Sequence, residues 1–355
     1  MKNSVCIIAP TPPPFGGMTT QARLLSDYLL FENARVIYVK TNWMPKTFRR
    51  LFENIRIIRT ILNVFFYFLF LIIACNRCKV VHIFACSNAY YYLHVIPSIL
   101  ITKLFKKRLI INYRGGEAAK FFHGFSRHTL LLMKLADAVA VPSGYLQHIF
   151  KELGIVTTII PNISQVEKFI YREPNFGNRI SFICTRNFER YYDVTTAVKA
   201  FSLARNHIKN ATLTLVGDGS LKTEIKNIVK KLSLSRVVKF AGHVSPQQMP
   251  HYLSSHDIFV NSSVVDNYPI SILEAFAVGL PLISTTAGGI PYLVTNMKNG
   301  ILVKPGDIEA LSNAMVSLAK NISLCKRLSK NAKQTADLHS WEKICPKLKK
   351  IYGWG

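Results

Sequence analysis

The chain has 355 residues, 49% of them hydrophobic and 18% charged, and a formal net charge of +26. This length and apolar content fit two domains with proper cores and exclude a disordered chain. The charge favours an anionic partner: a nucleotide diphosphate, an acidic lipid surface or a nucleic acid. Seven scattered cysteines and a first segment without a signal-peptide pattern predict a reduced, cytoplasmic protein.

In residues 1–163, short β-branched runs alternate with helical stretches, the pattern of a parallel sheet with crossover helices. The predicted strands of this first domain are Val5–Ala9, Val36–Val39, Val80–Phe84, Leu109–Asn112, Ala138–Val141 and Thr157–Ile160. Ligands of such sheets bind beyond the carboxyl ends of the strands, so the loops that follow strands are where a site is expected.

The first loop, Pro10–Gly17 (PTPPPFGG), joins the first strand to a helix expected to start near Met18. Gly16 and Gly17 would let backbone amides approach a ligand at the start of that helix. A dinucleotide site is disfavoured, because the loop is not GxGxxG and Lys40 rather than an acidic residue follows the second strand. An ordinary strand-to-helix turn is the alternative.

The segment Ile61–Cys75 is the one candidate membrane segment, but its length of about 15 residues is below the roughly 20 that a span needs. Basic residues flank it on both sides: Lys46, Arg49, Arg50, Arg56, Arg59, Arg77 and Lys79. Two interpretations are open. The segment is either a helix lying in the interface of an anionic membrane, with its arginines on headgroups, or a helix buried against the sheet.

Two features close the first domain. The NYRGGE loop after the fourth strand carries Arg114, whose guanidinium can offer a fork of donors to an oxyanion; a solvated arginine in a turn is the alternative.

Pro161–Asn162 then ends a strand, and the polar stretch Ser164–Asn178 contains Pro174 and Gly177. We predict the domain boundary in this stretch.

A second series of strands predicts a second doubly wound domain over residues 178–336, facing the first across a cleft. Its predicted strands are Ile180–Cys184, Thr212–Val216, Val237–Phe240, Ile258–Val260, Leu282–Ser284 and Gly300–Val303. The last stretch, residues 337–355, contains an amphipathic helix at Ser340–Tyr352, which could pack back onto the first domain.

Three loops of the second domain follow strands and carry candidate ligand contacts. In Thr185–Asp193, Arg186 and Arg190 lie where a diphosphate would approach, with solvated surface arginines as the alternative. The VGDGS and FAGHV loops place Gly217 and Gly242 at strand ends, so that a flat base or ribose could approach the backbone. Taken singly, these glycine loops are weak signals.

The strongest candidate is the segment Ser262–Glu274 (SSVVDNYPISILE). Its two acids, Asp266 and Glu274, are eight positions apart, and the amides around Ile270–Leu273 open a helix that could seat phosphate oxygens. Two carboxylates beside a phosphate site can accept hydrogen bonds from sugar and ribose hydroxyls. A capping box of Ser271 and Glu274 is the structural alternative, but it explains neither Asp266 nor the glycine pair that follows in AFAVGLPLISTTAGGIP.

At these residues the sequence resembles the family 4 glycosyltransferases of the GT-B fold. The matching segments are PPPFGG, NYRGGE, ADAVAVPSGYL, TIIPN, TRNFERYYD, VGDG, FAGHV and DNYPISILEAFAVGLPLISTTAGGIP. They run from residue 10 to about residue 303, and the stretch Asp266–Pro291 is the most specific. The resemblance implies two Rossmann-like domains facing across a cleft and a retaining transfer of a sugar from a nucleotide-sugar.

The resemblance also implies roles for single residues. Gly16 and Gly17 would line the cleft near the transferred sugar and the acceptor. Arg186 would hold the donor diphosphate, Asp266 would contact the donor sugar, and Glu274 would bind the nucleotide ribose. Further members of the implied nucleotide-sugar site are Arg114, Arg190, Gly217, Gly242, Asn267, Ile270, Ser271 and Ile272, of which the backbone of the three from Ile270 to Ile272 would meet the phosphates.

The chain departs from the family pattern in three places. Asp266 is one methylene shorter than the usual Glu, and Tyr191 replaces a lysine that the family often has. The histidine often found at the end of a first-domain strand is absent, with Asn112 and Arg114 in that neighbourhood. The diphosphate would therefore need Arg114 or Arg190 as a further cation.

The expected partners are a nucleotide-sugar, a glycan or lipid-linked saccharide acceptor in bacterial surface-polysaccharide synthesis, and the inner face of an anionic membrane. No metal or other cofactor is expected, since the chain has no HExxH, no DxD-type cluster and no Cys/His ligand spacing. Two other functions compete. A nucleotide-sugar 2-epimerase of the same fold would need an acidic pair that the first domain does not offer, and a basic nucleic-acid-binding protein would need a module that we do not recognise here.

Overall fold

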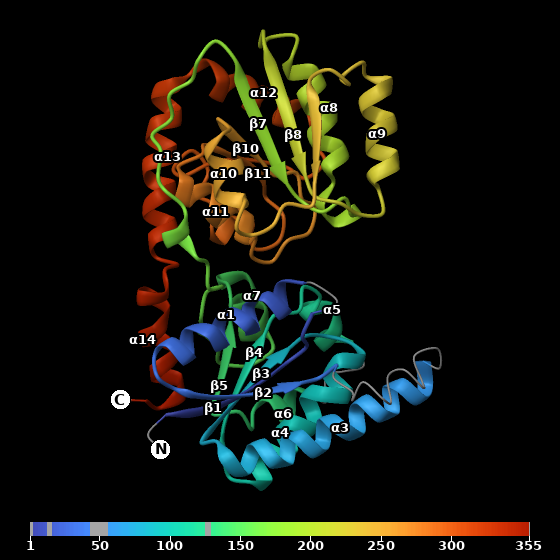
Figure 1. The fold of residues 1–355 in the computed structure, drawn as a ribbon, viewed down its shortest axis with the longest axis vertical. Helices are drawn as coiled ribbons and strands as arrows, with labels where there is room; N and C mark the ends of the chain where they lie inside the picture. The colour runs from blue at the N-terminus through green and yellow to red at the C-terminus, as the bar shows by residue number, and fades with distance from the viewer. Residues whose placement is uncertain (1–2, 13–15, 43–55, 125–128, 355) are drawn as a thin grey trace. The chain divides into compact units, whose positions relative to one another are not determined.

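The computed structural model describes residues 3–12, 16–42, 56–124 and 129–354. The chain divides into two compact units: unit 1 comprises Met1–Ile163 with Ile344–Gly355, and unit 2 comprises Ser164–Lys343. Each unit is built on a parallel sheet with helices packed against it (Figure 1). The end of the chain thus belongs to the unit that the chain builds first.

Unit 1 has, within its described residues, a six-stranded parallel sheet in the order β2-β1-β3-β4-β5-β6. Its strands are β1 (Ser4–Ala9), β2 (Arg35–Lys40), β3 (Val80–Ala85), β4 (Arg108–Tyr113), β5 (Ala138–Val141) and β6 (Thr158–Ile159). Each lies within two residues of its predicted range. The strand order reverses direction between β1 and β3, which makes the carboxyl ends of these strands the expected ligand side of the sheet.

Seven helical segments accompany this sheet in the described part of unit 1 before the chain enters unit 2. They are α1 (Gly17–Phe31), α3 (Arg56–Arg77), the π-helical turn η1 (Tyr91–Val95), α4 (Ile96–Leu104), α5 (Ala118–His123), α6 (Leu130–Met133) and α7 (Gly144–Glu152). β1 and β3 are buried along their whole length, as expected of strands covered on both faces. From α1, Gln21 donates to the carbonyl of Ile163 at 2.8 Å and accepts from its amide at 2.7 Å, which fixes the point where the chain leaves this unit.

α3 is longer than the apolar segment Ile61–Cys75, and the expectation that this region is too short to span a membrane was wrong. The helix has 22 residues, and its stretch Thr60–Arg77, with a mean hydropathy of 1.7, is long and apolar enough to cross a membrane by length and composition. It extends beyond the apolar run because the flanking arginines are good helix formers. Tyr67 and Leu71 are buried in the unit 1 core, whereas Ile61 and Phe65 on another face are 62% and 60% exposed.

The last helix, α14 (Trp341–Tyr352), carries the chain from unit 2 into unit 1. The hydroxyl of Tyr352 lies 2.7 Å from Nδ1 of His82, a fully buried residue of β3, and Arg108 donates from Nε to the carbonyl of Ile351 at 2.8 Å. Burial lowers the pKa of His82 to about 3. The imidazole is therefore neutral, and it holds the end of α14 through a hydrogen bond rather than through charge.

Unit 2 has a six-stranded parallel sheet in the order β12-β11-β10-β7-β8-β9 within its described residues. Its strands are β7 (Ile180–Thr185), β8 (Ala211–Val216), β9 (Val238–Gly242), β10 (Ile258–Val260), β11 (Leu282–Thr285) and β12 (Ile301–Val303). These strands also match their predicted ranges to within two residues. The order reverses between β7 and β10, so the carboxyl ends of these two neighbours form the crevice where a doubly wound sheet binds ligands.

The helices of unit 2 bury two apolar clusters against this sheet. They are α8 (Val194–Ala204), α9 (Lys222–Lys231), α10 (Met249–Ser254), α11 (Ile270–Val278), α12 (Ile308–Lys320) and α13 (Ile322–Asp337), with the short turns η3 (Val166–Lys168), η4 (Arg190–Tyr192) and η5 (Ile290–Tyr292). α11 is buried on nearly every side, as its largely apolar sequence requires.

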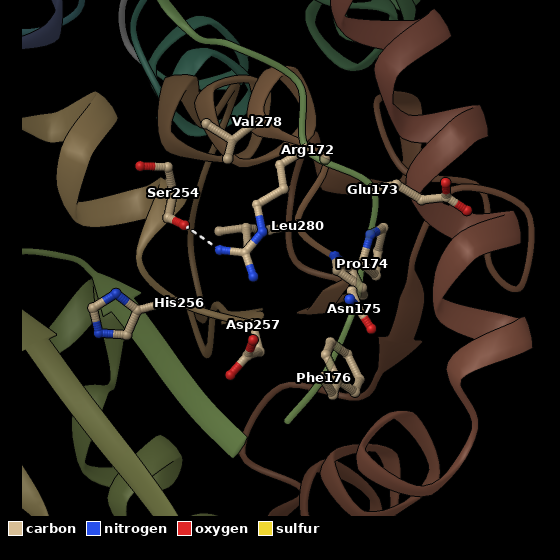
Figure 2. A pocket seen from close by; sticks show the side chains of 12 residues that line it. Arg172, Glu173, Pro174, Asn175, Phe176, Ser254, His256, Asp257, Val278 and Leu280 are labelled. Carbon is tan, nitrogen blue, oxygen red and sulfur yellow. Dashed lines mark hydrogen bonds between the residues drawn. The ribbon is translucent and has the colours of Figure 1, made fainter. Parts of the chain in front are cut away.

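The segment that leads into β7 is fastened to the carboxyl end of α11. Arg172 donates from its amide to the carbonyl of Val278 at 2.7 Å and from its guanidinium to the carbonyl of Ser254 at 2.9 Å (Figure 2). Gly279 has a φ of +92°, and a Cβ there would lie 2.6 Å from the carbonyl oxygen of Arg172. The cavity beside these contacts, about 10 Å³, has room for no more than a water molecule.

Candidate functional site

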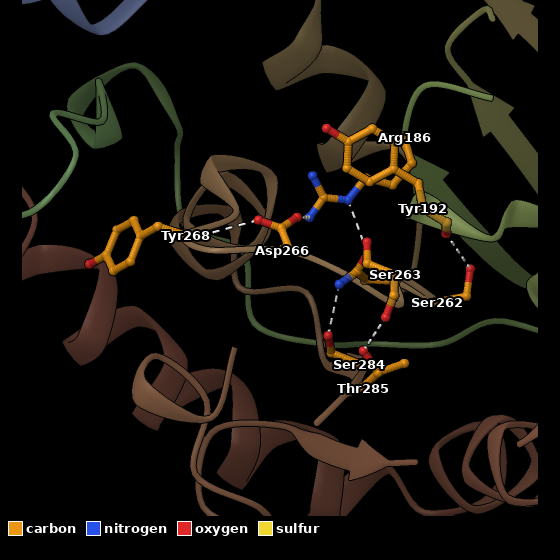
Figure 3. Close-up of polar contacts among 9 residues, drawn as sticks. Arg186, Tyr192, Ser262, Ser263, Asp266, Tyr268, Ser284 and Thr285 are labelled. Carbon is orange, nitrogen blue, oxygen red and sulfur yellow. Dashed lines mark hydrogen bonds and ion pairs between the residues drawn. The ribbon is translucent and has the colours of Figure 1, made fainter. Parts of the chain in front are cut away.

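Arg186 directly follows β7 and lies at the crevice between β7 and β10. Its Nε donates to Oδ1 of Asn261 at 2.9 Å, and its Nη2 forms an ion pair of 2.8 Å with Oδ2 of Asp266 (Figure 3). The guanidinium also lies over the ring of Tyr192, 5.1 Å from the ring centroid. These three contacts hold the cation in one orientation, as a site for an anion requires.

Asp266 is held by its carboxylate and by its backbone. The amide of Tyr268 donates to Oδ1 at 3.2 Å, and the amide of Gly289 donates to the Asp266 carbonyl at 2.8 Å. Glycine is required at Gly288 and Gly289, because a Cβ at these positions would lie 2.3 Å from the carbonyl oxygen of Asp266 and 1.9 Å from that of Asn267. The glycine pair after β11 therefore lets the Asp266 loop pack directly on its backbone.

Asn261 is a site residue that the sequence reasoning missed. It is fully buried, accepts from Arg186 and from the hydroxyl of Ser263, and donates from Nδ2 to Ser284 at 2.9 Å. Asn261 thereby connects Arg186 to β11 and to the loop after β10. A signal was present in the sequence, since the polar run Asn261–Ser263 directly follows an apolar strand.

Glu274 lies in α11, and the structure contradicts a capping box at this helix. α11 begins at Ile270 after Pro269, whose fixed φ suits a helix start, and no side chain caps it. Ser271 is consequently inside the first turn and cannot form a box with Glu274. No hydrogen bond holds the Glu274 carboxyl within the described residues, and burial raises its pKa to about 7, a shift that the charge of Arg186 partly offsets.

The start of α11 offers donors to an anion. The amides of Ile270 and Ser271 lie in the first turn, where N–H groups have no acceptor within the helix. The hydroxyl oxygen of Ser271 is buried and has no hydrogen-bond partner among the described residues. Ile272 differs from the expectation, because its amide donates to the carbonyl of Pro269 at 3.2 Å.

The two predicted glycines of the neighbouring loops have different surroundings. At Gly217, with a φ of +144°, a Cβ would lie 2.3 Å from the carbonyl oxygen of Arg186. Gly217 therefore supports the Arg186 backbone by close packing. Gly242 accepts from the amide of Gly217 at 2.8 Å, and nothing described lies within 4 Å of a Cβ built there, so its surroundings are open.

Arg190 and Asn267 complete the candidates in unit 2. Arg190 is exposed at the start of η4, and Asn267 is half-buried between Asp266 and α11. Tyr191, which stands where the family often has a lysine, is 62% exposed, and its carbonyl accepts from the amides of Val264 and Val265. The backbone of η4 thus joins the Arg186 loop to the Asp266 loop.

The other three candidates belong to unit 1. Gly16 precedes α1 and Gly17 begins it, and nothing described lies within 4 Å of a Cβ built on either, so packing does not explain the glycines. Arg114 follows β4, donates to Asn162 and lies over the ring of Phe84. Burial lowers the pKa of Arg114 to about 9, which contradicts the alternative of a solvated arginine.

In unit 2, the guanidinium of Arg186, the start of α11 and the carboxylates of Asp266 and Glu274 lie at one edge of the sheet. A diphosphate that carries hydroxylated groups on both sides matches this set of donors and acceptors. In the part of the chain that the structure describes, no group of three or more His, Cys, Asp and Glu side chains is placed to hold a metal ion.

Comparison with known proteins supports this interpretation. The family model of the glycosyl transferases group 1 matches residues 166–335, which is nearly all of unit 2. Sucrose-phosphate synthase of Zea mays is 29% identical over 170 residues, which are 43% of this chain and 16% of that protein. The chain thus matches only a small part of the length of this curated relative.

Solved structures extend the likeness to the whole chain. A glycosyltransferase from Rickettsia africae superposes with a TM-score of 0.75 at 18% identity, covering 99% of this chain and 98% of that one. HepE of Anabaena, solved with UDP, superposes with a TM-score of 0.76 at 15% identity and covers 99% of both chains. At these identities the likeness establishes the fold, and the predicted pair of Rossmann-like domains is confirmed. Residues 166–335 therefore match the model of the glycosyl transferases group 1, and the chain as a whole has the two-domain fold of these solved structures.

Proposed function

We propose that the protein is a glycosyltransferase whose donor, a nucleotide-sugar, binds at the carboxyl ends of β7 and β10. The observation that carries this proposal is the placement of Arg186, paired with Asp266, in the crevice of unit 2 beside the start of α11. Arg186 and the first amides of α11 hold the diphosphate, Asp266 contacts the sugar, and Glu274 accepts from the ribose. The family of unit 2 supports this assignment.

Transfer breaks the bond between the sugar and the diphosphate, and negative charge builds on the departing phosphate oxygen. A cation and a helix start that are already in place stabilise this charge without rearrangement, so a metal is not needed. We propose that the configuration of the sugar is retained and that the leaving phosphate accepts the proton of the acceptor hydroxyl. The acceptor oxygen then forms the new bond to the anomeric carbon.

We assign the acceptor to unit 1 and propose that it is a lipid-linked saccharide in the synthesis of a bacterial surface polysaccharide. The exposed apolar face of α3 supports a location at the cytoplasmic side of an anionic membrane. Because Tyr67 and Leu71 pack in the unit 1 core while Ile61 and Phe65 are exposed, lipid can reach one face of this helix only. We therefore propose that α3 lies in the membrane interface and does not span the bilayer.

The test of the donor site is titration calorimetry of the full-length protein with a panel of nucleotide-sugars. Arg186→Ala and Glu274→Ala are each expected to weaken donor binding by about 1–3 kcal/mol, the range for losing a hydrogen bond to a charged group. Arg236→Ala and Glu309→Ala are matched controls, because both side chains are exposed and neither lies in a loop after the carboxyl end of a strand. Unchanged donor affinity in both site variants, with the fold intact, would show that the donor binds elsewhere.

A further inference from the structure

Tyr268 ties the Asp266 loop to the turn between α13 and α14. Its amide donates to Oδ1 of Asp266 at 3.2 Å, and its hydroxyl is hydrogen-bonded to Nε2 of His339. In Figure 3 the tyrosine ring points away from the Arg186–Asp266 pair. One residue therefore holds the carboxylate with its backbone and the distant turn with its side chain.

Both ring nitrogens of His339 are hydrogen-bonded. His339 is 7% exposed, and its Nδ1 lies 2.7 Å from the carbonyl oxygen of Thr335, which can only accept. Nδ1 therefore carries a hydrogen, and when the ring is neutral its Nε2 accepts from the hydroxyl of Tyr268. Replacing the tyrosine by phenylalanine removes this donor and leaves the ring volume nearly unchanged.

His339 lies where the chain both enters and leaves unit 2. Unit 2 begins at Ser164, whose hydroxyl donates to the carbonyl of His339 at 3.5 Å. It ends at Lys343, four residues after His339 and inside the first turn of α14. The side chain of Tyr268 thus connects the candidate sugar-binding loop to both of these chain crossings.

We propose that Tyr268 and His339 form a positioning pair that sets the Asp266 loop for the sugar of the donor. This inference rests on the proposed function. The backbone of the loop is already fixed by Gly289, and the Asp266 carboxylate by Arg186, so the loop does not need the tyrosine hydroxyl in order to fold. The hydroxyl of Tyr268 connects the Asp266 loop to the residues where the chain leaves unit 2. Loss of this hydroxyl should weaken binding of the sugar and leave binding of the nucleotide unchanged.

The experiment compares Tyr268→Phe with the wild-type protein in binding of a nucleotide-sugar and of the corresponding nucleoside diphosphate. We expect affinity for the nucleotide-sugar and kcat to fall on the order of tenfold, the scale of one lost hydrogen bond, with affinity for the nucleoside diphosphate unchanged. His339→Gln should reproduce this split, and the double variant should be no weaker than either single one, as required of two residues that act through one contact. Tyr252→Phe on α10 is the matched control.

The outcomes separate the inference from the proposed function. If the wild type binds both ligands and Tyr268→Phe changes neither affinity, or lowers both equally, the positioning role is wrong. Additive losses in the double variant would also overturn it, because they would show that the two residues act independently. A wild-type protein that binds no nucleotide-sugar overturns the proposed function, and the inference with it.

Discussion

Arg186 and Asp266 neutralise each other, although each is a candidate for contacts to the donor. Their side chains are 10% and 11% exposed, so the pair lies largely out of water, where the attraction between charges is stronger than at the surface. Asn261 and Tyr192 also contact the Arg186 guanidinium, and together with Asp266 they hold this group in place. An incoming diphosphate would meet a cation that is already desolvated and oriented, which is the arrangement that stabilises a leaving group most effectively.

Glu274 predicts a pH dependence of donor binding. Its pKa of about 7 means that the carboxyl is mostly protonated at pH 6 and mostly ionised at pH 8. Since a carboxylate accepts stronger hydrogen bonds from hydroxyls than a carboxylic acid does, affinity for a nucleotide-sugar should rise several-fold over this interval. Calorimetry with Glu274→Gln provides the control: its affinity should be lower at pH 8 and nearly independent of pH. An identical pH profile in both proteins would contradict the assigned role.

The same residue should affect stability in the opposite direction. Between its ordinary value of 4.5 and the folded value of about 7, the folded chain keeps a proton that the unfolded chain has released. The contribution of Glu274 to the free energy of unfolding therefore falls as pH rises through this window. A carboxylate that is costly to the fold and placed beside an arginine is typical of a binding site.

The sequence indicated candidate site residues but not the partners that hold them. Asp266 and Glu274 stood out because two carboxylates beside a helix start can accept hydrogen bonds from sugar and ribose hydroxyls. The ion pair of Arg186 with Asp266 was not foreseen, since the residues are 80 positions apart and meet only through the order of the strands. The buried Asn261 was missed because a polar residue at a strand end shows its burial only once the sheet is assembled.

At the scale of elements, α14 shows how unit 1 is completed by residues that the chain makes last. Tyr352→Phe should lower the melting temperature, because it leaves the buried His82 without the hydroxyl that lies 2.7 Å from it. The expected cost is about 1–3 kcal/mol in the free energy of unfolding. Thermal denaturation followed by circular dichroism measures the change, with the partly exposed Tyr92→Phe of the same unit as the control. Equal melting temperatures for Tyr352→Phe and the wild type would show that the contact does not stabilise the unit.

Strands were predicted more accurately than helix ends. A buried parallel strand is a short apolar run bounded by turn residues, and this pattern depends on the local sequence alone. The capping box at Ser271 failed because the N-cap is Pro269, so that the helix starts two residues earlier than the box requires. The apolar run Ile61–Cys75 did not indicate the ends of α3, because the helix continues at both ends through polar and basic residues that are good helix formers.

At the scale of the whole molecule, the positive charge of +26 exceeds what a diphosphate site requires. In the proposed function, Arg186 and the start of α11 bind the diphosphate of the donor. We therefore expect turnover to persist in excess EDTA, because the charge on the leaving diphosphate is met by these groups. An assay of sugar release from the donor with and without chelator measures this. A complete loss of turnover that magnesium or manganese restores would contradict the expectation.

The remaining charge fits an acidic membrane, and α3 provides the apolar surface that would enter it. Arg56 begins α3 and Arg59 follows in its first turn, whereas Arg49 and Arg50 lie outside the described residues. Each basic residue near an anionic surface contributes about 1 kcal/mol, so four arginines could hold the protein there reversibly. Salt weakens this attraction, because it screens charges that lie more than about 10 Å apart at 0.1 M.

Co-sedimentation with vesicles tests this arrangement on the full-length protein. Binding should require acidic lipid, fall as salt is added, and drop when the four arginines become glutamine. The triple variant Ile61→Ser, Phe65→Ser and Leu69→Ser should also lose binding, because these three exposed side chains of α3 would enter the acyl region. Leu30→Ser with Phe31→Ser is the matched control, since both residues are exposed and apolar but lie at the end of α1. Equal binding to neutral and acidic vesicles, or none to either, would mean that the exposed face of α3 meets something other than an acidic bilayer and would leave the lipid-linked acceptor without support.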